Sequence, residues 1–398
     1  MAMRDTDVEI RGDSLEGSQI LLGVSGGIAA VDTVRLAREL RRHGANVSVM
    51  MTHSAQKIIS PLAVEWATQK NVITDWESDL SALDEFDGIL IAPTTRDLMA
   101  SYLHGLQHGP ILMALSAART RDCPVLMIPS MHSDLADDPV TTDLVSDVRG
   151  HGIHVHWGEK EEGKSKTPPH DEIVARFAHL VNSGKKNRKS IVITLGATRS
   201  PIDDIRFIQN TSSGQTGFSI ADYLYRHGHD VTCVKGLTST STPNWLPLVI
   251  DANEPDVMLK ELVALSNDDI DAWVHSAAVL DYVVEKSAEG KLASQQGPLD
   301  IRLIESPKHI LELKEKCKNA VRIGFKLEAG IKQKELVRRA VAQLEHSKMT
   351  AVIANRLEDI GDSDKPRAYL IDKTGSDFML EETSDLCIAI RTLIERGI

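Results

Sequence analysis

The sequence predicts two α/β domains in tandem, each built on a largely parallel sheet that helices cover. Short apolar runs alternate with helical stretches through the first half of the chain, which is the βαβ pattern of a parallel sheet buried on both faces. The same alternation begins again after residue 190. A length of 398 residues also exceeds one ordinary domain, so two domains are expected.

The strands of the first domain are expected where short runs rich in Val, Ile, Leu and Met are bounded by polar or glycine-containing segments. They are predicted at residues 20–24, 47–51, 88–92, 125–128 and 152–157. Helices are expected between them, the first ending near residue 42, and a helix at 171–182 closes the domain.

A polar and basic stretch, NSGKKNRK at 182–189, interrupts this periodicity. We interpret it as a solvated linker rather than a binding arm, which places the domains at 18–182 and 191–398 with a linker at 183–190. The second domain is predicted to contain strands at 191–194, 231–234, 248–250, 272–275, 321–325 and 351–354, and helices at 217–227, 257–265 and 334–345.

Composition narrows the class of protein. Hydrophobic residues make up 42% of the chain and charged residues 26%, as in a soluble globular protein. A net charge of −12 argues against a nucleic-acid binder, which needs a basic face. The four cysteines form no CxxC pair, so neither a zinc site nor a disulfide framework is indicated. The N-terminus is polar and no apolar run has the length of a membrane span, so we expect a cytoplasmic protein that binds no membrane.

One segment, residues 191–221, carries the strongest chemical signal. A predicted strand is followed there by a loop rich in small and hydroxyl-bearing residues that leads into a helix. The residues that offer exposed backbone N–H groups or short polar side chains are Gly196, Asn210, Ser212, Ser213, Gly214 and Gly217. Such a loop suits a phosphate. Because neither GxxxxGK[ST] nor GxGxxG is present, these residues alone predict an anion site of unspecified identity.

Several motifs then occur in one order along the chain. They are GVSGGIAAV at 23–31, MTHSAQKIISPL at 51–62, LIAPTTRDL at 90–98, PSMH at 129–132, TLGATRSPIDDIRFIQNTSSGQTG at 194–217, SAAVLDY at 276–282, IGFKLE at 323–328 and IANR at 353–356. Over about residues 18–395 the chain resembles the bifunctional phosphopantothenoylcysteine decarboxylase and phosphopantothenate–cysteine ligase of coenzyme A biosynthesis. The resemblance implies an N-terminal flavodoxin-like parallel-sheet domain followed by a Rossmann-like three-layer α/β domain.

For the first domain the resemblance implies FMN, which supports decarboxylation of 4′-phosphopantothenoylcysteine to 4′-phosphopantetheine. The residues that match the flavin-binding loops are Ser25, Gly26, Thr52, Ser60, Pro93 and Thr94. Each of them also suits an ordinary turn or helix cap, which is the alternative interpretation.

The same domain departs from the family pattern at three places. Asp79 stands where the family carries a His, and His132 replaces an Asn that holds the substrate. The flap at 159–166 has no Cys, so Lys164 or Lys166 is left as a candidate acid there. These departures keep open a second hypothesis, a ligase whose flavodoxin-like domain is catalytically degenerate.

For the second domain the resemblance implies a ligase. A nucleotide, CTP or ATP with CTP favoured, would activate 4′-phosphopantothenate as an acyl-nucleotide that the amine of cysteine attacks. Asn210 and Lys291 are the candidate catalytic residues, together with His132 of the first domain. The candidate nucleotide-binding residues are Ser212, Ser213, Gly214, Asp281, Lys291, Pro307, Lys308, His309, Ile310, Phe325 and Arg339. Gln215 stands where the family often has a Lys.

Each of these residues has a structural alternative, since Asp281 also suits a helix cap, Lys291 a solvated loop and Phe325 a hydrophobic core. The resemblance further implies Mg²⁺ held mainly by phosphate oxygens, and a homo-oligomer. A third hypothesis is a sensor that binds flavin and nucleotide without turnover. The joint presence of Asn210, Asp281 and Lys291 argues against that hypothesis.

Overall fold

The computed structural model describes residues 4–75, 84–267, 269–293, 297–362, 365–374 and 377–397. The chain divides into two compact units, Met1–Gly184 and Lys185–Ile398. Each unit has its own sheet and its own hydrophobic core. No helix in the described part of the chain has the length and apolarity that crossing a membrane requires.

The first unit contains a five-stranded parallel sheet with the strand order β2-β1-β3-β4-β6. The strands are β1 (Gln19–Val24), β2 (Asn46–Met51), β3 (Gly88–Thr94), β4 (Val125–Pro129) and β6 (His154–Val155). This is the flavodoxin-like order, in which the chain reverses its direction of travel between β1 and β3. The predicted flavodoxin-like parallel sheet is confirmed.

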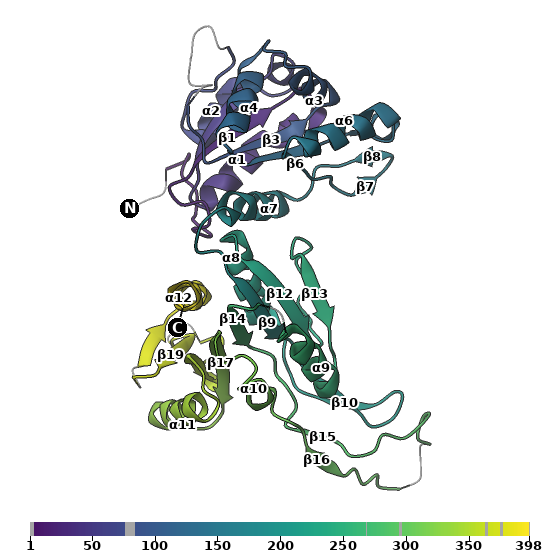
Figure 1. Cartoon of the computed structure of the whole chain (residues 1–398), viewed down its shortest axis with the longest axis vertical. Coiled ribbons are helices and arrows are strands. Elements are labelled where there is room, and N and C mark those ends of the chain that lie inside the picture. Colours follow the sequence, from purple (N-terminus) through teal and green to yellow (C-terminus); the bar gives the residue numbers. More distant parts are fainter. Residues whose placement is uncertain are drawn as a thin grey trace. The chain divides into compact units, whose positions relative to one another are not determined.

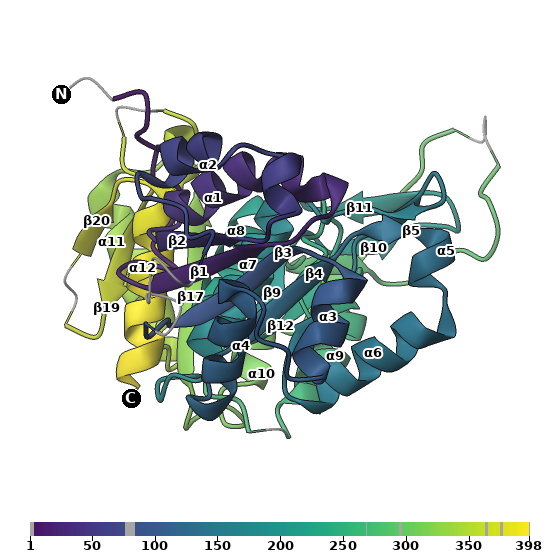
Figure 2. The ribbon, with the colours of Figure 1, turned by 90° about the horizontal axis from the view of Figure 1, so that it is seen from above.

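Helices cover both faces of this sheet (Figure 2). They are α1 (Thr33–Arg42), α2 (Pro61–Thr68) and α7 (His170–Ser183) on one face, and α3 (Arg96–Leu103), α4 (Pro110–Thr120) and α6 (Pro139–Gly150) on the other. Short elements complete the unit: η1 (Ile28–Asp32), η2 (Ala55–Lys57), α5 (Ser133–Ala136) and a small antiparallel sheet of β5 (Met131–His132), β7 (Lys160–Glu161) and β8 (Lys164–Ser165).

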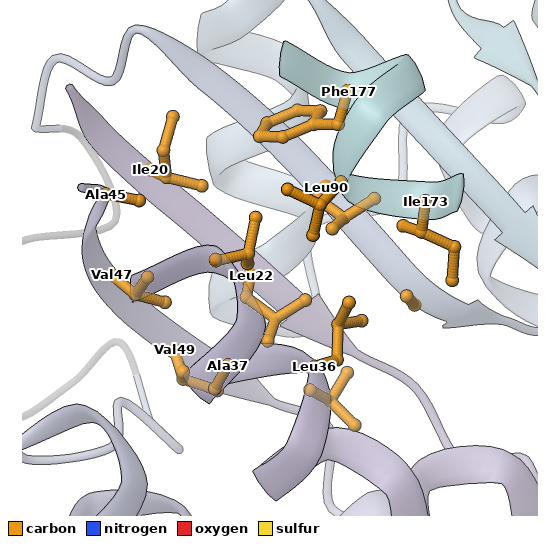
Figure 3. Packing of buried hydrophobic residues seen from close by; sticks show 14 of the residues in the cluster. Ile20, Leu22, Leu36, Ala37, Ala45, Val47, Val49, Leu90, Ile173 and Phe177 are labelled. Carbon is orange, nitrogen blue, oxygen red and sulfur yellow. The ribbon is translucent and has the colours of Figure 1, made fainter. Parts of the chain in front are cut away.

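The alternation of side chains along each strand explains why a hydrophobic core lies on each face of the sheet. On β1, Ile20 and Leu22 pack against α1 and α7, whereas Leu21 packs in the cluster on the opposite face. The same division by odd and even positions holds along β2, β3 and β4. Figure 3 shows the first cluster, with Phe177 of α7 and Leu90 of β3 among the labelled side chains.

One predicted strand is shorter than expected. The run at 152–157 was expected to form a strand throughout, but only His154–Val155 pairs, at the edge of the sheet beside β4. Gly152, with φ of +83°, belongs to the turn that follows α6, so the strand begins two residues later.

The second unit contains an eight-stranded sheet with the order β13-β12-β9-β14-β17-β18-β19-β20. The strands are β9 (Ser190–Leu195), β12 (Asp230–Lys235), β13 (Leu248–Asp251), β14 (Ala272–His275), β17 (Val321–Glu328), β18 (Ala351–Arg356), β19 (Ala368–Asp372) and β20 (Asp377–Leu380). The first six are parallel, and β19 and β20 extend the sheet in antiparallel pairs.

Helices again lie on both faces. Val192 of β9 belongs to the core cluster beneath α9, while Leu195, three positions on and therefore on the other face, meets Gly217 of α8. The helices are α8 (Gln215–Arg226), α9 (Pro255–Leu265), α10 (His309–Glu312), α11 (Gln333–His346) and α12 (Thr383–Arg396), with a short η4 (Leu357–Asp359). The predicted three-layer α/β architecture is confirmed.

Two antiparallel hairpin-like pairs project from this unit (Figure 1). One pairs β10 (Arg199–Pro201) with β11 (Phe207–Gln209), and the other pairs β15 (Tyr282–Val284) with β16 (Leu303–Glu305). In Figure 1, β10, β15 and β16 lie at the end of the unit away from α12. We call these four strands and their connecting loops the arm.

Candidate functional sites

The second unit contains a cavity of about 990 Å³ that is a candidate functional site. It opens at the carboxyl ends of the parallel strands β9, β14, β17 and β18, where ligands bind in open α/β sheets. Of the residues predicted from the sequence, those that line it are Gly196, Asn210, Ser212, Ser213, Gly214, Gly217, Asp281, Pro307, Lys308, His309, Ile310 and Phe325. Lys291 and Arg339 are not among the lining residues.

The predicted phosphate loop forms one wall of the cavity and ends in α8. Gly214 is the residue before the helix and has φ of +78°, a conformation that favours glycine. A Cβ atom at this position would lie 2.5 Å from Cγ2 of Thr238, so a side chain would not fit. Ser212 Oγ accepts a hydrogen bond from Gly214 N and Ser213 Oγ accepts one from Gln215 N, each at 3.3 Å. The loop thus turns tightly over the amino end of α8, where anions bind favourably.

Asn210 connects two walls of the cavity. Its side-chain Nδ2 donates a hydrogen bond to the carbonyl oxygen of Ala278 at 3.2 Å, and its backbone N donates to the carbonyl oxygen of Thr198. The loop after β14 is held further by Ser276, whose Oγ donates to the carbonyl oxygen of Thr194 at 2.6 Å. These contacts place the Asn210 amide between the loop that follows β9 and the loop that follows β14.

The charged and imidazole side chains that also line the cavity differ in their exposure. Asp281 and Lys308 are both exposed, and 4.0 Å separates Oδ1 of Asp281 from Nζ of Lys308. His309 and His275 are buried. Burial lowers the pKa of His309 and lowers the pKa of His275 to about 3, so both imidazoles are neutral near pH 7. The histidines therefore add no positive charge to the cavity.

Phe325 lies half-buried in the cavity wall, at the point where β17 leaves the core. Gln343 of α11 donates a hydrogen bond from Nε2 to the carbonyl oxygen of Phe325 at 3.3 Å and also lines the cavity. Lys326, the next residue, pairs with Glu328 at 3.1 Å. A phenyl ring on the wall of a cavity offers a flat apolar surface to a base, whereas a core position would have hidden it.

Lys291 lies on the arm. The segment around it is tied to the β10–β11 loop, because Gly290 N donates to Asp204 Oδ2 and Leu292 N donates to Asp203 Oδ2, each at 3.1 Å. Asp203 is buried and also accepts from the backbone N atoms of Ile205 and Arg206. These backbone hydrogen bonds, that of Arg206 first, lower the pKa of Asp203. The arm therefore holds the exposed Lys291 in a defined loop outside the cavity lining.

Arg339 is already bound by carboxylates. It lies exposed on α11, with ion pairs of 2.7 Å to Glu328 and 2.8 Å to Glu335. The hydrogen bond to Glu335 is the main cause that raises the pKa of Arg339. The structure thus places this predicted nucleotide contact in a surface ion-pair network beside the cavity-lining strand.

In the first unit, the predicted flavin-binding residues gather at the carboxyl ends of β1, β2 and β3. Ser25 is buried, and its Oγ donates to the carbonyl oxygen of Pro93 at 2.8 Å and accepts from Thr95 N at 2.9 Å. Thr94 is fully buried, and its Oγ1 donates to the carbonyl oxygen of Ile91 at 2.8 Å. Ser25 and Thr94 therefore fix the backbone where β1 and β3 end side by side.

Gly26, Thr52 and Ser60 lie closer to the surface. A Cβ atom on Gly26 would lie 2.3 Å from Cβ of Ser54, so the loops after β1 and β2 approach too closely for any side chain. Thr52 is half-buried, and its Oγ1 accepts from Ala55 N at 3.2 Å. Ser60 precedes α2 and is exposed, and its hydroxyl makes no capping hydrogen bond to that helix. Ser60 thus retains donor and acceptor capacity for a ligand.

The remaining predicted residues of this unit lie near the small β5-β8-β7 sheet. His132 is exposed on β5, with Nδ1 3.1 Å from a carboxylate oxygen of Asp134. Lys166, one of the two candidate acids, pairs with Glu161 at 2.5 Å, and that hydrogen bond raises the pKa of Lys166. The ion pair therefore makes this lysine a weaker proton donor. Asp79 lies outside the described residues.

Comparison with known proteins identifies the family. The model of the DNA/pantothenate metabolism flavoprotein C-terminal domain matches residues 186–396, and the flavoprotein model matches residues 9–182. The coenzyme A biosynthesis bifunctional protein CoaBC of Thermococcus kodakarensis is 33% identical over 372 residues, which cover 92% of this chain and 90% of the relative. The chain belongs to the CoaBC family. The CoaBC protein of Methanocaldococcus jannaschii is 31% identical over 90% of this chain and 89% of the relative. That of Escherichia coli is also 31% identical, over 74% of this chain and 76% of the relative.

Several residues that line the cavity were not predicted as site residues. Ser276 begins the SAAVLDY motif but was given no role, while Gln343 and Arg367 lie in no motif. Gln343 reaches the cavity because it lies on the face of α11 that packs against the unit. The helical periodicity of the sequence alone would have placed Gln343 on this face. Arg367 reaches the cavity through the pairing of β19 with β18, which the apolar pattern did not reveal.

Proposed function

We propose that this chain carries out two successive steps of coenzyme A biosynthesis. The domain at 191–398 joins 4′-phosphopantothenate to cysteine, and the domain at 18–182 decarboxylates the product with the help of FMN. Membership of the CoaBC family supports both activities. The observation that carries the ligase assignment is the cavity in which the phosphate loop, Asn210 and Phe325 meet.

The geometry of the cavity suits an acyl-nucleotide reaction. We assign the nucleotide phosphates to the loop of Ser212, Ser213 and Gly214, because that loop presents the amino end of α8. The base would lie against Phe325. The acyl group would then lie near Asn210, whose amide is held between two walls and is positioned to donate to a developing oxyanion. CTP is the proposed nucleotide and ATP the alternative.

The metal in this reaction would be Mg²⁺ bound mainly through the nucleotide. Asp281 is the one carboxylate among the described residues that line the cavity, and it is exposed. A single carboxylate does not make a cage for a divalent ion, whereas Mg²⁺ is commonly held by substrate phosphates with water and one or two carboxylates. We therefore expect the metal to enter with the nucleotide.

The position of Lys291 supports a homo-oligomer. A lysine that neutralises an acyl phosphate must reach the cavity, yet Lys291 is held on the arm by hydrogen bonds to the β10–β11 loop. The arm also exposes apolar side chains that water does not favour, namely Ile205, Phe207, Tyr282, Leu299, Leu303 and Ile304. We infer that the arm packs on a second copy of the chain and that Lys291 completes the cavity of that copy.

The first unit suits FMN. The loops after β1, β2 and β3 meet where the strand order reverses, and Gly26 allows the first two of these loops to approach closely, because a Cβ atom there would lie 2.3 Å from Cβ of Ser54. Ser60 and Thr52 would hold the flavin at this edge, while Ser25, Pro93 and Thr94 keep the backbone in place. When bound, FMN supplies the reversible oxidation that makes loss of CO₂ possible. His132 would lie against the substrate from the β5 side.

The decisive experiment separates the two activities. Purified protein would be incubated with 4′-phosphopantothenate, cysteine, Mg²⁺ and either CTP or ATP, and both pyrophosphate and CO₂ would be measured. Release of both supports the proposal. Release of pyrophosphate without CO₂ would support the ligase-only alternative. The absence of both products would refute the proposed function. A flavin absorbance spectrum of the purified protein tests FMN independently.

A further inference from the structure

Arg367 is one of the residues that line the ligase cavity, and it directly precedes β19 (Ala368–Asp372). Its Nη2 atom donates a hydrogen bond to Oγ1 of Thr216 at 2.8 Å. Thr216 is the second residue of α8, directly after the phosphate loop. A contact between residues 151 positions apart therefore brings a guanidinium to the amino end of the helix.

Arg367 differs from the other cations around the cavity in that no carboxylate pairs with it among the described residues. Lys308 lies 4.0 Å from Asp281, and Lys326 lies 3.1 Å from Glu328. Arg367 makes no ion pair with any carboxylate in the described part of the chain, and its side-chain partner there is the neutral hydroxyl of Thr216. Among the described basic residues of the lining, Arg367 is the one whose charge is not offset.

This arrangement is unfavourable unless an anion is present. Arg367 is half-buried, and burial lowers its pKa with no carboxylate to oppose the effect. The amino end of α8 carries partial positive charge of its own, so the helix and the guanidinium repel each other. Gln215, the first residue of α8, adds no charge. A phosphate between the helix and the guanidinium would be attracted by both.

We propose that Arg367 binds the phosphate groups of the nucleotide in the ligase cavity. This inference rests on the proposed function of that cavity. A guanidinium has five N–H donors, and the bond to Thr216 uses one of them, so a fork of donors remains for phosphate oxygens. Thr216 fixes the direction in which that fork points.

The test compares Arg367→Gln with the wild-type protein. Isothermal titration would measure the affinity for CTP and ATP, for the nucleosides cytidine and adenosine, and for 4′-phosphopantothenate. We expect the affinity for the triphosphate to fall by about 10- to 100-fold, the range typical of a lost charged hydrogen bond. Affinities for the nucleoside and for 4′-phosphopantothenate should be unchanged. Arg338→Gln is the matched control, because Arg338 lies exposed on α11 and pairs with Glu335.

A rescue variant distinguishes charge from structure. Gln215→Lys places a cation on the same helix turn, so Arg367→Gln combined with Gln215→Lys should recover most of the lost affinity if phosphate binding is the role of Arg367. A merely structural role would leave the double variant as weak as the single one. Arg367→Lys, which keeps the charge but loses the fork, should show an intermediate loss and remains informative if Arg367→Gln does not fold.

The outcomes separate this inference from the proposed function. If the wild-type protein binds neither CTP nor ATP and forms no pyrophosphate, the proposed function is wrong. If the wild-type protein binds a nucleotide and Arg367→Gln binds it equally well, the assignment of Arg367 is wrong while the proposed function stands. A loss of affinity for 4′-phosphopantothenate alone would also overturn the assignment, because the guanidinium would then serve the other phosphate.

Discussion

Replacement of Gly217 by Ala tests how closely α8 must pack for the ligase cavity to work. A Cβ atom on Gly217 would lie 2.3 Å from Cβ of Leu195 and 3.0 Å from Oγ of Ser276. Nonbonded carbon atoms approach to about 3.5–4 Å, so the helix would have to move by roughly 1 Å or more. Leu195 is fully buried at the end of β9 and has little room to yield.

The magnitude follows from two opposing contributions. Overpacking of this kind costs about 1–3 kcal/mol, whereas Ala favours a helix over Gly by about 1 kcal/mol. The net change in the free energy of unfolding therefore ranges from about zero to about 2 kcal/mol of destabilisation. Ligation should suffer more, since a displacement of about 1 Å at a reacting site can reduce the rate by about 100-fold. The phosphate loop ends only three residues before Gly217.

Amide hydrogen exchange along α8 and the rate of pyrophosphate formation would measure the two effects. The control is Gly150→Ala, because Gly150 is also helical and a Cβ atom there would have no neighbour within 4 Å. That control should be neutral or slightly stabilising and should leave ligation unchanged. Wild-type protection of α8 together with a wild-type ligation rate in Gly217→Ala would refute the reasoning.

Three further predictions follow from the two units. Gly26→Ala should lower the flavin content of the purified protein, measured by absorbance, and leave pyrophosphate formation unchanged, whereas Gly109→Ala, whose Cβ atom would meet nothing within 4 Å, should retain flavin. Inactive Asn210→Ala and Lys291→Ala proteins, mixed so that subunits exchange, should regain about a quarter of the wild-type ligase activity if sites are shared in a dimer, and no recovery would argue against a shared site. Because burial lowers the pKa of His275 to about 3, the unfolded state binds the proton first as the pH falls below about 6.5, so stability should decline there by about 1.4 kcal/mol per pH unit. Denaturant titrations at several pH values should show a shallower decline for His275→Leu, and an unchanged slope would contradict this assignment.

Much of the fold was predictable because a buried parallel strand leaves an unmistakable apolar run. The strands that carry the sites, such as β9 and β14, were located to within one residue for this reason. The antiparallel elements were not predicted. The strands β10, β11, β15 and β16 project from the unit and expose side chains such as Phe207 and Tyr282, so their sequences show no buried run.

Some of the predicted site residues line the cavity and others do not. Residues in contiguous motifs directly after strands, such as Asn210 and Ser212, do line the cavity, because the carboxyl ends of parallel strands share one edge of the sheet. Lys291 and Arg339 were assigned from position in a pattern, and the structure places both outside the lining. No local pattern in the sequence indicates that the arm holds Lys291 outside the cavity lining.

The contrast between Arg339 and Arg367 shows which physical information the sequence lacks. Both are arginines near the last strands of the sheet, and a motif comparison favours Arg339. Glu328 and Glu335 already neutralise Arg339, so a phosphate that bound there would have to displace two carboxylates. Arg367 has only a neutral hydroxyl as its side-chain partner within the described residues and keeps its full charge for a ligand. The nature of the partner, which depends on pairing between distant segments, therefore decides which guanidinium is available to an anionic ligand.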